Sequence, residues 1–198
     1  MEPFATIQDY QDLIQSELTG LAATAIDHAL LAVSQAIRNT TEQTISLVED
    51  DTIILNGNGR ETMLLPQIPI VAVTQVTFTD RNAVVTDVTA DIKLYDAAAG
   101  IIFHPTPHWG CDDCFPWGVQ NVTVTYTHGY ATIPDDLKNV TILAAKHLVQ
   151  QGLTATNLQS QTVGPFTDVY QTSSVTAGDL EPFMGVIEYY RGPRIPVG

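Results

Sequence analysis

The stretch from Val122 to Gly152, VTVTYTHGYATIPDDLKNVTILAAKHLVQQG, decides the fold because its periodicity changes abruptly. Apolar residues alternate with threonines as far as Thr127, which is typical of a strand with one buried face. Pro134 then opens a helix, and two aspartates follow it where carboxylates favour the positive end of the helix dipole. We expect this helix to end at Gly152.

Two helices are predicted ahead of this junction. Thr6 can cap a first helix, which we expect to run through Leu18 and to end at Gly20. Apolar residues at helical spacing from Ala22 to Ile37 predict a second helix that ends just beyond Ile37.

The middle of the chain is predicted to be rich in strands and turns. Asn-Gly-Asn-Gly at positions 56–59 is a hairpin signal between two extended runs. The predicted short strands ahead of the junction are Thr52–Leu55, Glu61–Leu65, Ile70–Thr79, Ile92–Tyr95 and Ile101–Phe103. The predicted fold class is therefore α+β: a helical bundle formed by N- and C-terminal helices (1–43 and 133–198, with a C-terminal arm) and an inserted β-rich domain (44–132).

Composition excludes several classes of function. The net charge of −14, from 22 acidic and 8 basic side chains, argues against a surface that grips nucleic-acid phosphates or anionic lipid. Charged residues make up only 15% of the chain, which suggests that partners cover part of its surface. No secretory signal or membrane-spanning run is recognisable, so we expect synthesis inside the host cell.

The order of motifs along the chain resembles one protein family. The order begins with a strand, the residues His-Gly-Tyr, then Ile-Pro and a helix that starts with acidic residues. Next come Ser-Gln-Thr-Val-Gly at 160–164 and a final helix, which is expected to begin near Pro182 and to end in Tyr190-Arg191. This order is similar to that of the head–tail connector (adaptor) proteins of tailed phages. The resemblance covers roughly the first 40 residues and the last 75.

The resemblance implies a structural protein without enzymatic activity. Such adaptors form a ring, commonly of twelve subunits, between the portal protein and a stopper or tail-completion protein. Genomic DNA passes through the ring without sequence-specific binding, and the terminal region docks against the portal. It also implies a virion location at the head–tail interface, after assembly in the host cytoplasm. The interface candidates are Phe183, Ile187, Tyr190, Arg191, Arg194 and Ile195.

One short segment has the residue types of a zinc site. His104, His108, Cys111 and Cys114 lie within eleven residues, and Cys-x2-Cys is the usual zinc-knuckle spacing. Structural zinc sites usually separate their two ligand pairs by a dozen or so residues, whereas here all four lie in one loop. The alternatives are a local disulfide and two unligated thiols, and we expect unligated thiols, with no metal and no cofactor.

Two other functions fit the same region. Trp109, Phe115 and Trp117 could form an aromatic surface, which would make the middle of the chain a β-rich phage ligand-binding module. A small zinc-binding structural protein centred on the two cysteines is the other alternative. No spacing typical of a nucleophile elbow, a zinc protease or a phosphate-binding loop occurs, so the sequence predicts no enzyme.

Overall fold

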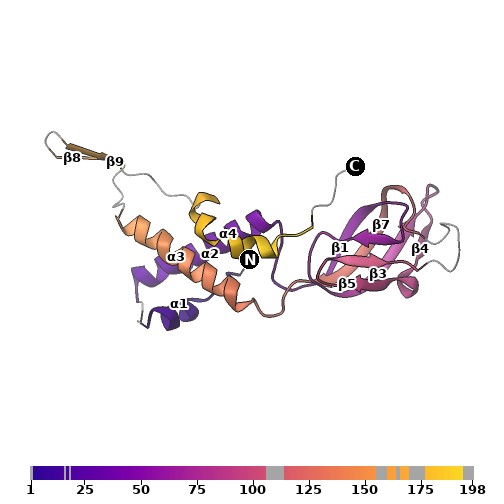
Figure 1. The fold of residues 1–198 in the computed structure, drawn as a ribbon, viewed down its shortest axis with the longest axis horizontal. Coiled ribbons are helices and arrows are strands. Elements are labelled where there is room, and N and C mark those ends of the chain that lie inside the picture. Colours follow the sequence, from indigo (N-terminus) through magenta and orange to yellow (C-terminus); the bar gives the residue numbers. More distant parts are fainter. Residues whose placement is uncertain are drawn as a thin grey trace. The chain divides into compact units, whose positions relative to one another are not determined.

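The structure is a computed structural model that describes residues 2–15, 17, 19–105, 114–154, 160–163, 166–169 and 177–193 (Figure 1). The chain divides into two compact units. The helical unit consists of Met1–Glu42 and Ile133–Arg191. The β unit consists of the residues 43–132 together with Gly192 and Pro193. The fold class is α+β, as predicted from the sequence.

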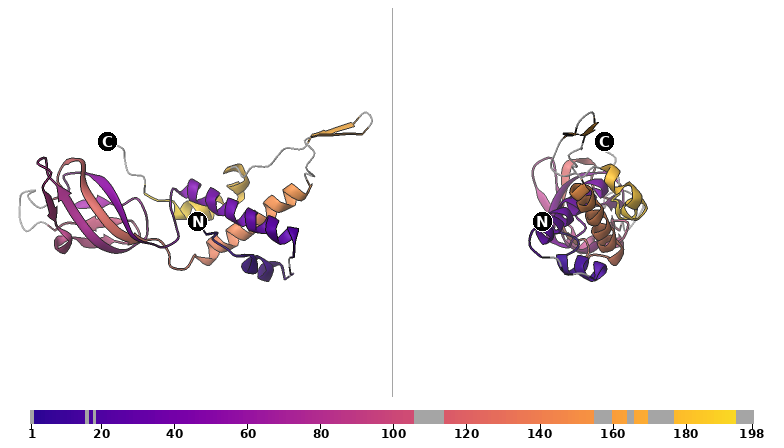
Figure 2. Two further views of the ribbon diagram at one scale, coloured as in Figure 1. Left: turned by 180° about the vertical axis from the view of Figure 1, so that it is seen from behind. Right: turned by 90° about the vertical axis from the view of Figure 1, so that its left-hand side faces the viewer.

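The helical unit is built around two long helices, α2 and α3, which pack against each other (Figures 1 and 2). Its elements are α1 (Ile7–Ile14), α2 (Leu21–Thr41), α3 (Asp135–Thr154), β8 (Ser160–Val163), β9 (Phe166–Val169), η3 (Ala177–Phe183), α4 (Met184–Ile187) and η4 (Glu188–Tyr190). None of the helices in the described part of the chain is long and apolar enough to cross a membrane.

The first helix begins where the sequence predicts and ends earlier. Thr6 and Asp9 form a capping box, in which the Thr6 side chain accepts from the Asp9 N–H and the Asp9 carboxylate accepts from the Thr6 N–H. The predicted end at Gly20 is wrong, because Gln15 adopts a left-handed conformation (φ 53°) and its N–H closes the helix on the carbonyl of Gln11. Leu18 lies outside the described residues.

The predicted end of the third helix is also wrong. Helix α3 continues through Gly152 to Thr154. A glycine inside a helix costs only about 1 kcal/mol relative to alanine, so it weakens a helix without stopping it. The final α-helix, α4, begins at Met184, two residues after Pro182, and it follows the 3-10 segment η3, in which Pro182 lies.

The apolar faces of the helical unit meet in one core. Leu30, Ile37, Leu137, Leu180 and Ile187 are each at most 1% exposed. Helix α3 is apolar on a second side as well, where Leu143 remains 44% exposed. That second side of α3 is available to another molecule, either a second copy of this chain or a different protein.

The β unit is a two-layered antiparallel structure. Its strands are β1 (Val48–Gly57), β2 (Thr62–Leu64), β3 (Ile70–Thr79), β4 (Val85–Asp87), β5 (Lys93–Asp96), β6 (Ile101–Phe103) and β7 (Gly118–His128), with a short 3-10 turn η1 (Thr89–Asp91). One sheet has the order β1-β7-β3-β4 and the other β2-β6-β5. Side chains from both sheets, among them Met63, Val76, Ile102 and Val124, form a single buried cluster.

Two strands are longer than the sequence predicts, and one was not predicted. Strand β1 begins at Val48 because a bulge at Asp50 (φ 49°) accommodates the acidic residues before Thr52. Strand β7 extends from Gly118 to His128 and pairs with both β1 and β3. Strand β4 is exposed along its whole length, so it has no apolar alternation that would reveal it.

Tyr126 at the centre of β7 gives the β unit a sensitivity to alkali. The side chain is fully buried, and burial, with a smaller contribution from the charge of Asp51, raises the pKa of its hydroxyl to about 12. Because this folded-state pKa lies above the ordinary value of 10.0, the tyrosine stabilises the fold fully below pH 10, and that contribution is lost as pH rises towards 12.

We therefore expect the wild-type protein to lose stability between pH 10 and pH 12, and we expect Tyr126→Phe to remove most of that loss. The measurement is urea unfolding across this range, together with the ultraviolet absorbance of tyrosinate. Tyr95→Phe is the matched control, since Tyr95 is 72% exposed. Identical pH profiles for Tyr126→Phe and the wild type would contradict the assignment.

Candidate interaction surfaces

Hydrogen bonds join the C-terminal segment of the helical unit to the start of α3. The Tyr190 hydroxyl lies 2.7 Å and 2.9 Å from the two carboxylate oxygens of Asp136. One of these oxygens also accepts the backbone N–H of Leu137. A carboxylate in the first turn of a helix is stabilised by the free N–H groups there, so Asp136 is a well-placed acceptor.

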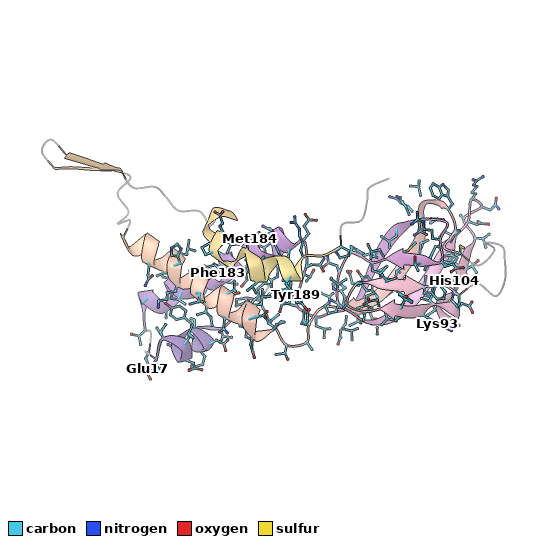
Figure 3. All side chains as sticks on the ribbon, in the orientation of Figure 1. Glu17, Lys93, His104, Phe183, Met184 and Tyr189 are labelled. Atoms are coloured by element: carbon cyan, nitrogen blue, oxygen red, sulfur yellow. The ribbon has the colours of Figure 1, made fainter. Side chains whose placement is uncertain are left out.

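The predicted interface residues of this segment differ in how exposed they are in the structure. Ile187 is fully buried and Tyr190 is 8% exposed, so both belong to the core of their own unit. Phe183 is half-buried. Tyr189, which was not among the predicted residues, is 80% exposed (Figure 3).

The segment ends in basic and apolar residues. The Arg191 guanidinium lies 4.0 Å from the Glu42 carboxylate within the helical unit, where the Arg191 side chain is half-buried and the Glu42 side chain is exposed. Such a pair contributes little to stability, which leaves Arg191 available to another partner. Arg194 and Ile195 lie outside the described residues.

We expect Tyr190→Phe to lower the free energy of unfolding of the helical unit by about 2 kcal/mol, because it leaves a partly buried carboxylate without its hydroxyl donor. Chemical denaturation measures this change. The control is Tyr189→Phe, which alters the neighbouring exposed ring and is expected to change stability by less than about 0.5 kcal/mol. Equal effects of the two variants would show that the contact with Asp136 contributes nothing.

A cleft opens at one end of the β unit, and we name it the tip cleft. Its volume is about 840 Å³, and its lining includes Phe78, Arg81, Asp91, His104, Cys114 and Trp117. The β3–β4 hairpin forms one wall, and the residues that lead into β7 form the other. Clefts of this size with a mixed apolar and charged lining are typical of binding sites.

Two of the four zinc candidates lie in this cleft. His104 is 5% exposed and Cys114 is 6% exposed, and both line it. The His104 ring packs against Phe78 and Phe115, with centroid distances of 5.9 Å and 6.0 Å, and its Nδ1 atom is buried without a hydrogen-bond partner. Figure 3 labels His104 in the β unit.

The other two candidates, His108 and Cys111, lie outside the described residues. Within the part of the chain that is described, no group of three or more His, Cys, Asp or Glu side chains could hold a metal ion. The described residues therefore form no metal centre by themselves, and the aromatic packing of His104 accounts for its burial.

The predicted aromatic surface is divided between core and solvent. Phe115 is fully buried in the β-unit core, whereas Trp117 is 83% exposed at the rim of the tip cleft. Trp109 lies outside the described residues. Val119, two residues beyond Trp117, is 80% exposed and lines the same cleft. No sequence signal marked Val119, because it lies beyond an irregularity of β7 at Gln120 (φ 53°), where the regular alternation of the strand is interrupted.

Comparison with known proteins places the chain in a family. A family model described as "Head completion protein" matches residues 3–191, nearly the whole chain. No curated protein matches. The family match confirms the resemblance to phage connectors that the order of motifs indicated.

Solved structures with the same fold come from gene transfer agent particles. One is a chain in the "Virion of native gene transfer agent (GTA) particle", with 21% identity, a TM-score of 0.56 and coverage of 100% of this chain and 95% of that one. A second is in the "Neck of native GTA particle computed with C12 symmetry", with 21% identity, a TM-score of 0.53 and coverage of 92% and 97%.

A third is in the "Neck of empty GTA particle computed with C6 symmetry", with 19% identity, a TM-score of 0.53 and coverage of 97% and 91%. At these identities the similarity establishes the fold. The family assignment rests on the model that matches residues 3–191. This chain belongs to the head completion protein family, a family of structural and not enzymatic proteins.

Proposed function

We propose that this head completion protein assembles into a ring of twelve copies between the portal protein and a stopper or tail-completion protein, and that the ring lines the channel for the genome. The family match over residues 3–191 carries the proposal. The chains of similar fold in neck structures computed with C12 and C6 symmetry support a ring.

A closed ring needs two different contact surfaces on each subunit, one for each neighbour. Exposed apolar side chains in both units supply candidates. In the helical unit, Leu143 on α3 and Tyr189 are 44% and 80% exposed. In the β unit, Trp117 and Val119 are 83% and 80% exposed. Burial of such side chains between copies would stabilise the ring through the hydrophobic effect.

The charge of the chain suits a channel that DNA passes through. Each copy carries a net charge of −14, so twelve copies together repel phosphate groups that approach closely. Screening limits this repulsion to about 8 Å at physiological salt. We propose that the channel wall is acidic or neutral, with Glu49, Asp50, Asp51, Asp112 and Asp113 as candidates; the last two lie outside the described residues.

The first test is the mass of the purified protein by native mass spectrometry over a range of concentrations. The proposal predicts a species of twelve 21.5 kDa chains, about 258 kDa. Leu143→Asp changes an exposed position and serves to probe the α3 contact, with Thr52→Asp at an exposed position of strand β1 as its matched control. A protein that stays monomeric at every concentration, alone and with portal, would refute the ring.

The second test is DNA binding. We expect the isolated protein to show no measurable affinity for duplex DNA at low salt, where electrostatic attraction to phosphates is strongest. Fluorescence anisotropy with a labelled duplex measures this. A micromolar affinity for duplex DNA would contradict a passive channel and would favour a ring that grips DNA.

A further inference from the structure

Helix α2 has an exposed stripe on the side that faces away from the core of the helical unit. The buried side of this helix consists of Ile26, Leu30, Val33 and Ile37. Because successive residues of an α-helix are rotated by about 100°, the opposite side consists of Thr24, His28, Leu31 and Gln35, which we call the α2 stripe. All four are exposed, and Leu31, the large apolar side chain among them, is 37% exposed.

Helix α3 has a second exposed stripe of the same form. The side of α3 that packs into the core includes Leu137, Val140 and Ala144. On the far side lie the residues that we call the α3 stripe, Asn139, Leu143, Lys146 and Gln150. Lys146 is half-buried and the other three are exposed, with Leu143 at 44%. Successive members are four, three and four residues apart, and the members of the α2 stripe have the same spacing.

The two stripes lie on opposite sides of one helix pair. Helices α2 and α3 pack against each other through their buried sides, so the stripe on each helix faces outwards (Figures 1 and 2). A closed ring needs such an arrangement, because each subunit offers one surface to the neighbour on one side and a different surface to the neighbour on the other. The helical unit therefore has a candidate surface for each neighbour.

The charge of the chain favours these stripes as contacts between copies. Two copies that each carry a net charge of −14 repel each other, so they meet at the lowest cost where carboxylates are absent. None of the residues in the two stripes is acidic, although the chain has 22 acidic residues. Asp27 adjoins the α2 stripe and Lys146 belongs to the α3 stripe, so the two surfaces also carry opposite charges.

We propose that the α3 stripe of one copy packs antiparallel against the α2 stripe of the next copy in the ring. The reversed order of one stripe matches the other at every position, since both have the same spacing. The pairs are Asn139 with Gln35, Leu143 with Leu31, Lys146 with His28, and Gln150 with Thr24. This inference rests on the ring proposed above and assigns one of its contacts.

The antiparallel direction is the one that matches the chemistry of the two stripes. It brings Leu143 onto Leu31, where the burial of both side chains is favourable, and it places Lys146 beside Asp27. A parallel alignment would instead place Lys146 on Leu31 and Leu143 on His28. The matched spacing and the opposite charges belong to one and the same chain, and this selects a second copy as the occupant.

Site-specific photocrosslinking tests the contact in the full-length chain. Leu143 is replaced by p-benzoylphenylalanine, and light and ¹⁵N-labelled copies are mixed before assembly. Mass spectrometry then shows which residues are joined and whether the two peptides carry different labels. We expect crosslinks between position 143 and residues 24–35 of the other isotope. The same probe at Leu94, a β-unit position that is 43% exposed, is the matched control and should give no crosslink to residues 24–35.

A charge reversal tests the recognition. Lys146→Glu and Asp27→Lys should each lower the yield of the intersubunit crosslink about tenfold, and the double variant should restore it. Restoration also shows that the single variants lost the contact and not the fold. Lys93→Glu is the matched control, since it makes the same change of charge at an exposed position of the β unit, and the yield should be unchanged.

The outcomes separate this inference from the ring itself. A twelve-subunit mass with crosslinks from position 143 only within the same chain, or only to residues outside 24–35 of the other copy, would overturn the stripe contact and leave the ring in place. Crosslinks from position 143 to the portal instead, in a mixture with portal, would overturn it as well. Absence of any oligomer, alone and with portal, would overturn both.

Discussion

Gly129→Val is expected to destabilise the β unit by about 3 kcal/mol or more, the largest effect of a single substitution considered for this unit. Gly129 has a φ of 91°, which side-chain-bearing residues rarely adopt. A Cβ atom there would overlap the Ser46 carbonyl oxygen and lie 2.8 Å from that of Ile45. These are backbone atoms that cannot rotate away as a flexible side chain could.

Gly129 also closes the junction between β7 and the segment that leads to α3. Its N–H donates to Pro69, and the next residue, Tyr130, donates to the Ile45 carbonyl. Denaturant unfolding, followed by near-ultraviolet circular dichroism, measures the loss. Gly185→Ala in α4 is the matched control, because a Cβ there meets nothing within 4 Å, and it is expected to be neutral or slightly stabilising. A loss below about 1 kcal/mol for Gly129→Val would contradict the strained geometry.

Ile187→Ala is expected to destabilise the helical unit by about 3 kcal/mol. The side chain is fully buried, and helix α4, which carries it, contacts both α2 and α3. Truncation would leave a cavity in the place where the C-terminal segment is held to the rest of the unit. Hydrogen exchange should show faster exchange over residues 177–190 and a lower global stability in denaturant.

Tyr189→Ala provides the control for that experiment, because it truncates a larger side chain that is 80% exposed. Its effect on unfolding should stay within about 0.5 kcal/mol. If Tyr189→Ala lowered stability as much as Ile187→Ala, the order of burial in this segment would be wrong.

The parts of the fold that were predicted correctly are those with strong local signals. Thr6 caps α1 through a short-range hydrogen bond, and the strict alternation of β7 reports one buried face directly. The ends of the helices were less predictable than their presence. Gly152 does not stop α3, whereas the left-handed Gln15 does stop α1, so the intrinsic preference of one residue did not fix either end.

The candidate surfaces were only partly predictable for a different reason. Which of two adjacent tyrosines is buried depends on the 3-10 turns η3 and η4, and these put Tyr190 inside and Tyr189 outside. The tip cleft joins Arg81 to Trp117, which are far apart in the chain, so it depends on sheet pairing that no local pattern encodes. The family, in contrast, followed from the order of motifs along the chain.

Electron microscopy of the purified protein mixed with its portal protein tests the central claim most directly. We expect a ring of twelve copies of this chain, coaxial with the portal, whose channel wall is acidic or neutral. Control grids of each protein alone separate a ring of this chain from the portal's own ring. A portal that shows no added density, or density from single copies attached outside the axis, would contradict the account.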